Sequence, residues 1–404
     1  MKEGAQRVIR LATGESTRRS RLDAEHLTEV IRQRGVEQLG LALENEVWLM
    51  LDGSDMRKPH ARAMKELMWV RDLQKNPVRG YRTLNVIGVT PGRRGVLYHR
   101  LYSDNEPEFV SEPAETQRAL KSVSEAIQGM AGRKTAIWIM DREFDDVAVW
   151  RTIWEQGAQL VCRVKHTERL IDLPGTNGEW EAGNIEAARS KMELYATVRT
   201  DMVVCRGRQK QAKRQWVPAE IRACPIRVTY ETNVRREGDG RTERKTLWVA
   251  EVRFLGTRLE PWLLITDIPV TDAESAMRVF RMYRQRWAVE DAFKYIKDSL
   301  GWEEVQLLDL RGIRTLVAMA WVAAAFLYEL GVTLEWPEVE LLARLGGWAA
   351  KKDNNPGKGV ITRGLRRLID MVTTRALLDA HIDQYGGLPP RILALLNGLA
   401  PTDL

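Results

Sequence analysis

The chain has 404 residues, of which 44% are hydrophobic and 29% charged, so it is long enough for two or three domains and too apolar to be disordered throughout. Its three cysteines, Cys162, Cys205 and Cys224, show no CxxC spacing, which excludes a disulfide framework or a cysteine-based zinc site and favours a reducing, cytoplasmic setting. The formal net charge of +7 favours a polyanionic partner such as nucleic acid, although basic proteins with other partners are common.

The N-terminal part of the chain is predicted to begin with a basic helical leader over residues 1–45, because arginine-rich segments are followed by a helical period of apolar residues. The run VWLMLD comes next. It is almost continuously apolar and ends in Asp52, as expected of a buried strand that leads into a loop. A polar helix is expected over residues 59–72. Two strand-like runs then flank a Pro-Gly turn signal at residues 91–92, which predicts a hairpin.

A second set of elements completes the predicted sheet. A helix is expected over residues 113–130, and the apolar run TAIWIMD after it ends in Asp141. A helix near residues 145–156 and the strand QLVCRVK follow. This order predicts an α/β fold over residues 46–169, with a mixed sheet flanked by helices. Because functional groups collect at the carboxyl ends of neighbouring strands, Asp52 and Asp141 are expected to lie close together, where a divalent cation would relieve their repulsion.

The texture of the sequence changes at residues 170–268 to β-branched, glycine-punctuated and arginine-rich segments, which predict a mostly β insertion. Its basic clusters RGRQKQAKR and NVRREGDGRTERK are read either as solvated hairpin tips or as contacts to phosphate. Helical texture returns for a second part of the core at residues 269–345 and for a helical C-terminal segment at residues 346–404. The apolar run at residues 316–328 is too short to cross a bilayer, so it is read as a buried helix and no membrane partner is expected.

The most informative segment begins at Arg281. Tyr283, Arg286, Glu290 and Lys297 are spaced by three, four and seven residues, so on one α-helix they fall on a common face. An amphipathic helix with i, i+4 ion pairs would show the same spacing. The match gains weight because two strand-end aspartates precede it in the chain.

Together these features resemble the DDE transposases of bacterial insertion sequences, in the group with a β-rich insertion between the second aspartate and the glutamate. The resemblance covers about residues 47–328 through WLMLDGSD, WIMDREFDD, LVCRVKH, WLLITDIPV and a complete Tyr-x2-Arg-x3-Glu-x6-Lys signature. It implies a ribonuclease H-like core whose catalytic acids are Asp52, Asp141 and Glu290, with Asp55 as the alternative for the first position.

The resemblance also implies a metal cofactor. Phosphodiester cleavage suits two hard cations about 4 Å apart, and Mg²⁺ or Mn²⁺ fits carboxylate ligands in a chain poor in His and Cys. Asp52 would bridge both ions, Asp141 would hold one and Glu290 the other. The residues expected near the DNA are Tyr283, Arg286 and Lys297, together with Trp287 and Lys165.

Some of these residues have a plainer interpretation. Trp287 and Trp302 would stack on a displaced base if cleavage passes through a DNA hairpin, but burial beside the core helix is the favoured reading. Lys165 either faces the acids or faces solvent. Arg142 and Glu143 are read as loop residues that support the second aspartate.

The expected function is metal-dependent cleavage and strand transfer at the ends of an insertion sequence by a cut-and-paste route, with the chain acting as a homodimer on double-stranded DNA. A catalytically silent DNA-binding derivative and a ribonuclease H-like nuclease that only hydrolyses are the alternatives. Relatives commonly carry a substantial N-terminal DNA-binding domain, whereas about 45 residues precede Val47 here. Recognition of the ends is therefore expected to rest on the insertion and C-terminal segments, or to be incomplete as in a truncated copy.

Overall fold

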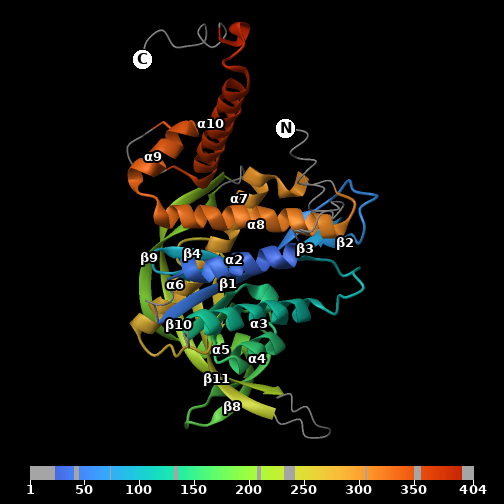
Figure 1. The fold of residues 1–404 in the computed structure, drawn as a ribbon. Coiled ribbons are helices and arrows are strands. Elements are labelled where there is room, and N and C mark those ends of the chain that lie inside the picture. The colour runs from blue at the N-terminus through green and yellow to red at the C-terminus, as the bar shows by residue number, and fades with distance from the viewer. Residues whose placement is uncertain are drawn as a thin grey trace. The chain divides into compact units, whose positions relative to one another are not determined.

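The computed structural model describes residues 23–40, 45–72, 74–131, 135–206, 211–231, 242–304, 307–349 and 356–393. The arginine-rich start of the leader, most of the two basic clusters and most of the polar segment KKDNNPGKG lie outside the described residues. The chain divides into two compact units, residues 1–329 and 330–404. Figure 1 shows the fold, with the strands of the first unit drawn from blue through green to yellow.

The first unit is built on one twelve-stranded sheet. Its strands are β1 (Glu46–Arg57), β2 (Met68–Arg71), β3 (Pro77–Thr90), β4 (Arg93–Tyr102), β5 (Thr135–Met140), β6 (Gln159–Arg163), β7 (Leu170–Pro174), β8 (Trp180–Asn184), β9 (Glu193–Arg206), β10 (Gln211–Glu231), β11 (Thr242–Phe254) and β12 (Trp262–Thr266). Its main helices are α2 (Ala24–Gln38), α3 (Glu112–Ala131), α4 (Val147–Glu155), α5 (Ile185–Ala188), α6 (Ala273–Gln285), α7 (Trp287–Leu300) and all but the last four residues of α8 (Leu310–Thr333).

The core of the sheet has the strand order β4-β3-β1-β5-β6. Strand β1 pairs antiparallel with β3 and parallel with β5, and β5 pairs parallel with β6. This order and these directions are those of a ribonuclease H-like sheet. The predicted α/β fold with a mixed sheet flanked by helices is therefore confirmed.

The polar helix expected over residues 59–72 is wrong, because this stretch ends in the short strand β2. The segment MWVR alternates buried and exposed side chains, as a strand with one covered face does. Strand β3 extends to Pro77, five residues beyond the positions that pair with β4, and this extension offers the edge on which β2 pairs.

The predicted β-rich insertion extends the core sheet instead of forming a separate one. Strand β12 pairs antiparallel with β6, and β11 and β10 follow in the same sheet. Strand β9 pairs along β10 to complete a long hairpin. The insertion thus continues the hydrogen-bond ladder of the core.

Two apolar clusters cover opposite faces of the core sheet, because successive side chains of a strand point to opposite sides. In β5, Ile137 and Ile139 join the cluster formed with α6, α7 and α8, whereas Trp138 joins the cluster formed with α3 and α4. Both faces of β1 and β5 are therefore covered by helices.

Helix α8 contains the apolar run that was read as a buried helix. By length and composition it is apolar enough to cross a membrane. Ile313, Val317 and Trp321 on this helix are nevertheless fully buried in the cluster that covers the sheet. One face of α8 therefore serves as a core helix.

The second unit contains α9 (Trp336–Leu345) and α10 (Lys358–Tyr385). The two helices approach closely at Gly364, where an added Cβ would lie 1.8 Å from the carbonyl oxygen of Leu342. The absence of a side chain at this position allows α10 to pack directly on the backbone of α9.

Candidate active site

The two strand-end aspartates lie at the same edge of the sheet. Asp52 lies in β1, and Asp141 directly follows β5. Because β1 and β5 are parallel neighbours with Leu51 paired to Met140, the next residue of each strand is an aspartate. The carboxylate of Asp141 makes no helix-cap hydrogen bond to the short turn that follows it, so it remains available to the site.

Glu290 lies on α7, and the sequence did not predict the boundary between this helix and α6. A single helix was expected to carry all four residues of the signature, but α6 ends at Gln285 and α7 begins at Trp287. At Arg286 the backbone forms tighter i→i−3 hydrogen bonds, from Arg286 N–H to the Tyr283 carbonyl and from Val289 N–H to the Arg286 carbonyl. The chain keeps helical dihedrals here, which is why the sequence pattern alone does not show the break.

Arg286 lies at the centre of the site. Its guanidinium donates from Nη1 to Asp52 Oδ2 at 2.8 Å and from Nη2 to Glu290 Oε1 at 2.5 Å. Tyr283 donates its hydroxyl to Asp141 Oδ1 at 3.1 Å. The structure thus brings together the three predicted acids and two of the residues predicted to contact DNA.

The two aspartates differ in their electrostatics. Burial raises the pKa of Asp52 to about 7, and the charges of Asp141 and Glu290 add to the rise although Arg286 opposes it. Burial also acts to raise the pKa of Asp141, but Arg286 and the backbone N–H of Arg142 outweigh it, so the pKa of Asp141 lies below its ordinary value. Of the two aspartates, Asp52 is therefore the one whose protonated form is favoured by its surroundings.

These acids fit a divalent cation by donor type and by charge. Carboxylate oxygens are the ligands that Mg²⁺ and Mn²⁺ prefer, and one guanidinium leaves the three carboxylates with an excess of negative charge. The positive group between Asp52 and Glu290 is at present the side chain of Arg286. Among the described residues no three His, Cys, Asp or Glu side chains come close enough to hold an ion together. Ion binding would therefore require the acids to draw together as Arg286 withdraws.

The other predicted DNA-binding residues surround this centre at different depths. Lys297 donates from Nζ to Ser54 Oγ at 2.8 Å, which ties α7 to the end of β1. Trp287 is partly buried and packs edge-on against Trp262. Lys165 is exposed. Trp302 is only 1% exposed, so its alternative role in stacking on a base is wrong and the buried reading holds.

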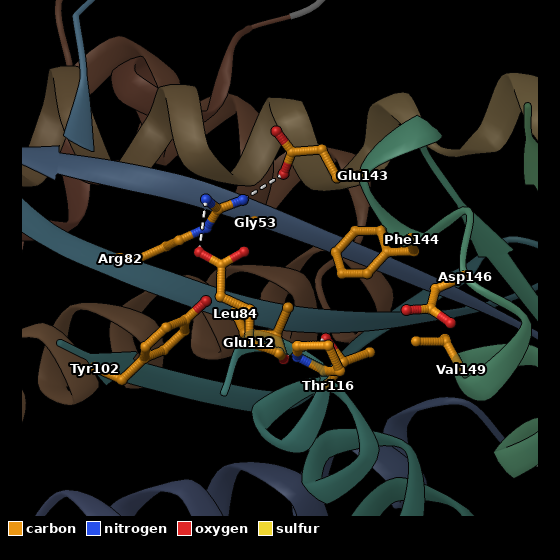
Figure 2. A pocket seen from close by; sticks show the side chains of 11 residues that line it. Gly53, Arg82, Leu84, Tyr102, Glu112, Thr116, Glu143, Phe144, Asp146 and Val149 are labelled. Atoms are coloured by element: carbon orange, nitrogen blue, oxygen red, sulfur yellow. Dashed lines mark hydrogen bonds and ion pairs between the residues drawn. The ribbon is translucent and has the colours of Figure 1, made fainter. Parts of the chain in front are cut away.

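A small hollow of about 80 Å³ lies beside Gly53 and Glu143, each of which is close in sequence to one of the aspartates. Figure 2 shows the side chains that line it, and none of the three acids is among them. Within it Arg82 bridges two glutamates, with Nη1 at 3.1 Å from Glu112 and Nη2 at 2.6 Å from Glu143. Since Glu143 lies two residues after Asp141, this bridge joins the loop of the second aspartate to β3 and to the first turn of α3. The sequence predicts no role for Arg82, because nothing in the local pattern pairs it with residues 30 and 61 positions away.

Asp145 is a second residue that sequence reasoning missed. Its side chain is fully buried, pairs with Arg169 at 2.6 Å and accepts the backbone N–H groups of Lys165 and His166. The cluster of acids in REFDD after Asp141 was the available signal. Asp145 fixes the loop after β6 against the loop after β5.

A buried polar chain supports the strand that carries Asp52. Asn85, which lies opposite Asp52 on β3, accepts a hydrogen bond from His99 Nδ1 at 2.7 Å and donates to Thr83 Oγ1 at 3.0 Å. The Thr83 hydroxyl in turn donates to the carbonyl of Ser54 at 3.0 Å. These bonds connect the interior of the sheet to the strand end that presents the acid.

The chain was compared with protein families, curated proteins and solved structures. A family model described as the transposase DDE domain matches residues 49–327 of the chain. No curated protein matches. Among solved structures, a cryo-EM structure of a piggyBac transposase synaptic complex with hairpin DNA is similar at 7% sequence identity and a TM-score of 0.40, covering 89% of this chain and 58% of that one. The chain thus spans somewhat more than half the length of that protein.

Proposed function

The chain belongs to the transposase DDE domain family, and from this premise we propose that it is a metal-dependent DNA transposase that cleaves and transfers strands at insertion-sequence ends by a cut-and-paste route. The observation that carries the proposal is the meeting of the three acids with Arg286 and Tyr283 at one edge of the sheet. These residues come from three distant parts of the sequence.

The proposed roles of the acids follow from their positions. Asp52, Asp141 and Glu290 are the proposed metal ligands, and members of this family generally use divalent metal ions. When bound, such ions activate the attacking water or 3′-hydroxyl and stabilise the leaving 3′-oxygen. No nucleotide hydrolysis is needed, because each phosphodiester bond that breaks supplies the energy of the next.

The cationic residues of the signature are proposed to hold the DNA strand in place. Arg286 is 7% exposed, and its Nε is buried without a hydrogen-bond partner in the described part of the chain. A phosphate oxygen would supply the missing acceptor. Lys297 is held at the end of β1 by Ser54, where its charge complements a neighbouring phosphate. Tyr283 orients Asp141, and Trp287 and Lys165 are proposed to contact the strand farther from the acids.

Nicking of end-labelled duplex DNA with Mg²⁺ or Mn²⁺ tests the assignment. Asp141→Ala, Asp52→Ala and Glu290→Ala should each lower nicking by at least about a hundredfold, since loss of a metal ligand removes several kcal/mol of transition-state stabilisation. Asp55→Ala is the matched control, because Asp55 lies on the same strand and accepts the backbone N–H of Arg71 instead of joining the acids. Loss of nicking in Asp55→Ala with retention in Asp52→Ala would move the first catalytic position to Asp55.

Two further outcomes separate the alternatives. Tight DNA binding without nicking by the wild-type chain would identify a catalytically silent derivative. Cut ends that never join to added target DNA would identify a nuclease that only hydrolyses. The expected result is DNA product in which the cut ends are joined to target DNA. We propose that a homodimer bound to paired ends forms this product and that the protein works in the cytoplasm.

A further inference from the structure

The segment that starts near the end of the proposed catalytic strand is basic. Residues 55–82 carry eight lysines and arginines against three aspartates and glutamates, an excess of five. Arg57 and Arg82 are paired with glutamates. The exposed cations of the segment are Arg62, Lys65, Arg71, Lys75 and Arg79. A surface of this sign complements the phosphates of a polyanion.

An exposed tryptophan lies within this basic segment. Trp69 on β2 is 61% exposed, whereas Trp138, Trp150, Trp302 and Trp321 are fully buried. The guanidinium carbon of Arg79 lies 4.3 Å from the centre of the Trp69 ring and covers one of its faces. Arg79 is itself fixed by a 3.1 Å hydrogen bond from Nη1 to the carbonyl of Leu67. The indole is therefore held in one orientation with its other face open to solvent.

The register of the sheet puts Trp69 on the same face as Asp52. Trp69 pairs with Arg79 on β3, and Asp52 pairs with Asn85 on the same strand. Positions 79 and 85 differ by an even number, so their side chains and those opposite them point to one side of the sheet. Six residues of strand span about 20 Å, which is close to the rise of six nucleotides. In Figure 1, β2 lies beside β3.

We propose that Trp69, Arg71 and Arg79, which we call the β2 platform, bind an unpaired nucleotide of the DNA strand that the acids act on. The base stacks on the open face of Trp69, and its flanking phosphates contact Arg71 and the exposed cations nearby. The nucleotide must be unpaired because bases inside a duplex are already stacked on their neighbours. This inference rests on the proposed function for the presence of DNA, and it adds a binding site outside the acid cluster.

DNA binding by the full chain without divalent ions tests the platform. The probes are a fluorescent blunt duplex and the same duplex with a short single-stranded 3′ tail. The wild type should prefer the tailed probe by about tenfold, equivalent to about 1.4 kcal/mol. Trp69→Ala should abolish the preference and Trp69→Phe should retain most of it. Trp336→Ala, which removes a 51% exposed tryptophan from α9, is the matched control and should keep it. Arg71→Gln should reduce the steepness with which the logarithm of the binding constant falls with the logarithm of salt concentration. The reduction should correspond to about one released counterion for both probes.

Retention of the tail preference by Trp69→Ala overturns the proposal. A second overturning result is specific to the edge position of β2, whose outer side has no partner among the described strands. If Trp69→Ala changes the oligomeric state in sedimentation but leaves tail preference intact, the platform binds a second copy of the chain. The results distinguish failure of the platform from failure of the transposase proposal. If the wild type nicks DNA and Trp69→Ala keeps the tail preference, only the platform is wrong. If the wild type shows the Trp69-dependent tail preference but never nicks DNA, only the transposase activity is wrong.

Discussion

Arg286 holds two of the three acids through a single guanidinium, and this position makes its replacement informative. In Arg286→Ala, Asp52 and Glu290 lose their shared cation, so the metal-free protein should lose roughly 2 kcal/mol of stability. Mn²⁺ should restore the lost stability, because a divalent ion can then take the place of the guanidinium. Thermal melts with and without Mn²⁺ measure this, and the shift caused by Mn²⁺ should be larger in Arg286→Ala than in the wild type.

The matched control for this prediction is Arg278→Ala. Arg278 pairs with Glu46 in a more exposed setting away from the acids, so its removal should change the melts little and leave the Mn²⁺ shift as in the wild type. Equal Mn²⁺ shifts in all three proteins would show that Arg286 does not occupy the place of an ion.

Protonation of His99 makes the stability of the fold depend on pH. Burial lowers the pKa of His99 to about 3 from an ordinary 6.5, so the folded protein keeps the imidazole neutral while the unfolded chain protonates it. Between pH 6.5 and pH 3 the unfolded state binds more protons, and stability present above pH 6.5 is lost as the pH falls. The loss should approach about 1.4 kcal/mol per pH unit. In melts from pH 7 to pH 4, the loss of stability per pH unit should be smaller in His99→Gln than in the wild type.

At the residue scale the sequence predicted that the three acids approach one another but not how Arg286 pairs with them. A strand-end acid and a spaced signature are local patterns, so the placement of Asp52 and Asp141 at strand ends and of Glu290 on a helix could be predicted; their catalytic role stays a prediction. The bridge from Arg286 to Asp52 joins positions 234 residues apart, and the bridge from Arg82 to Glu143 joins positions 61 apart. Such contacts depend on strand pairing and helix packing that no single segment encodes.

Helix α2 packs on β4 through backbone atoms at two glycines. A Cβ on Gly35 would lie 2.2 Å from the carbonyl oxygen of Val96, and a Cβ on Gly95 would lie 2.4 Å from the carbonyl oxygen of Gly35. Gly35→Ala should therefore push α2 off the strand and cost about 2 kcal/mol in chemical denaturation. Gly129→Ala on α3 is the control, because a Cβ there meets no atom and should stabilise the helix by up to about 1 kcal/mol. An unchanged stability of Gly35→Ala would contradict the contact.

At the element scale the predictions were right where a segment has a clear local pattern of apolar residues. The strands that end in Asp52 and Asp141 are long apolar runs, and the helix over residues 113–130 has a clear N-terminus. Strand β2 was missed because four residues offer only two buried positions, and the edge of β3 decides its conformation. The division between α6 and α7 was missed because Arg286 keeps helical dihedrals through the tighter turn.

For the whole molecule, the sequence predicted a core and a β-rich insertion but not that they share one sheet. The join is the pairing of β12 with β6, which brings together residues about a hundred positions apart. The residue composition of a segment indicates that it forms strands, whereas the strand with which it pairs is determined only in the assembled sheet. The same pairing delivers the chain to α6, and so fixes where Glu290 meets the edge with the two aspartates.

The division of the chain into two units predicts which truncation survives. All members of the two apolar clusters that cover the sheet precede residue 330, and α8 contributes the fully buried Trp321. A chain that stops after Thr333 keeps α8 and the three acids, so it should unfold cooperatively and retain metal-dependent nicking. A chain that stops after Asp309 lacks α8 and uncovers one face of the sheet, so it should fail to fold. Circular dichroism melts and the nicking assay compare the two. Loss of folding in both chains would mean that residues 334–404 belong to the same cooperative structure as the sheet.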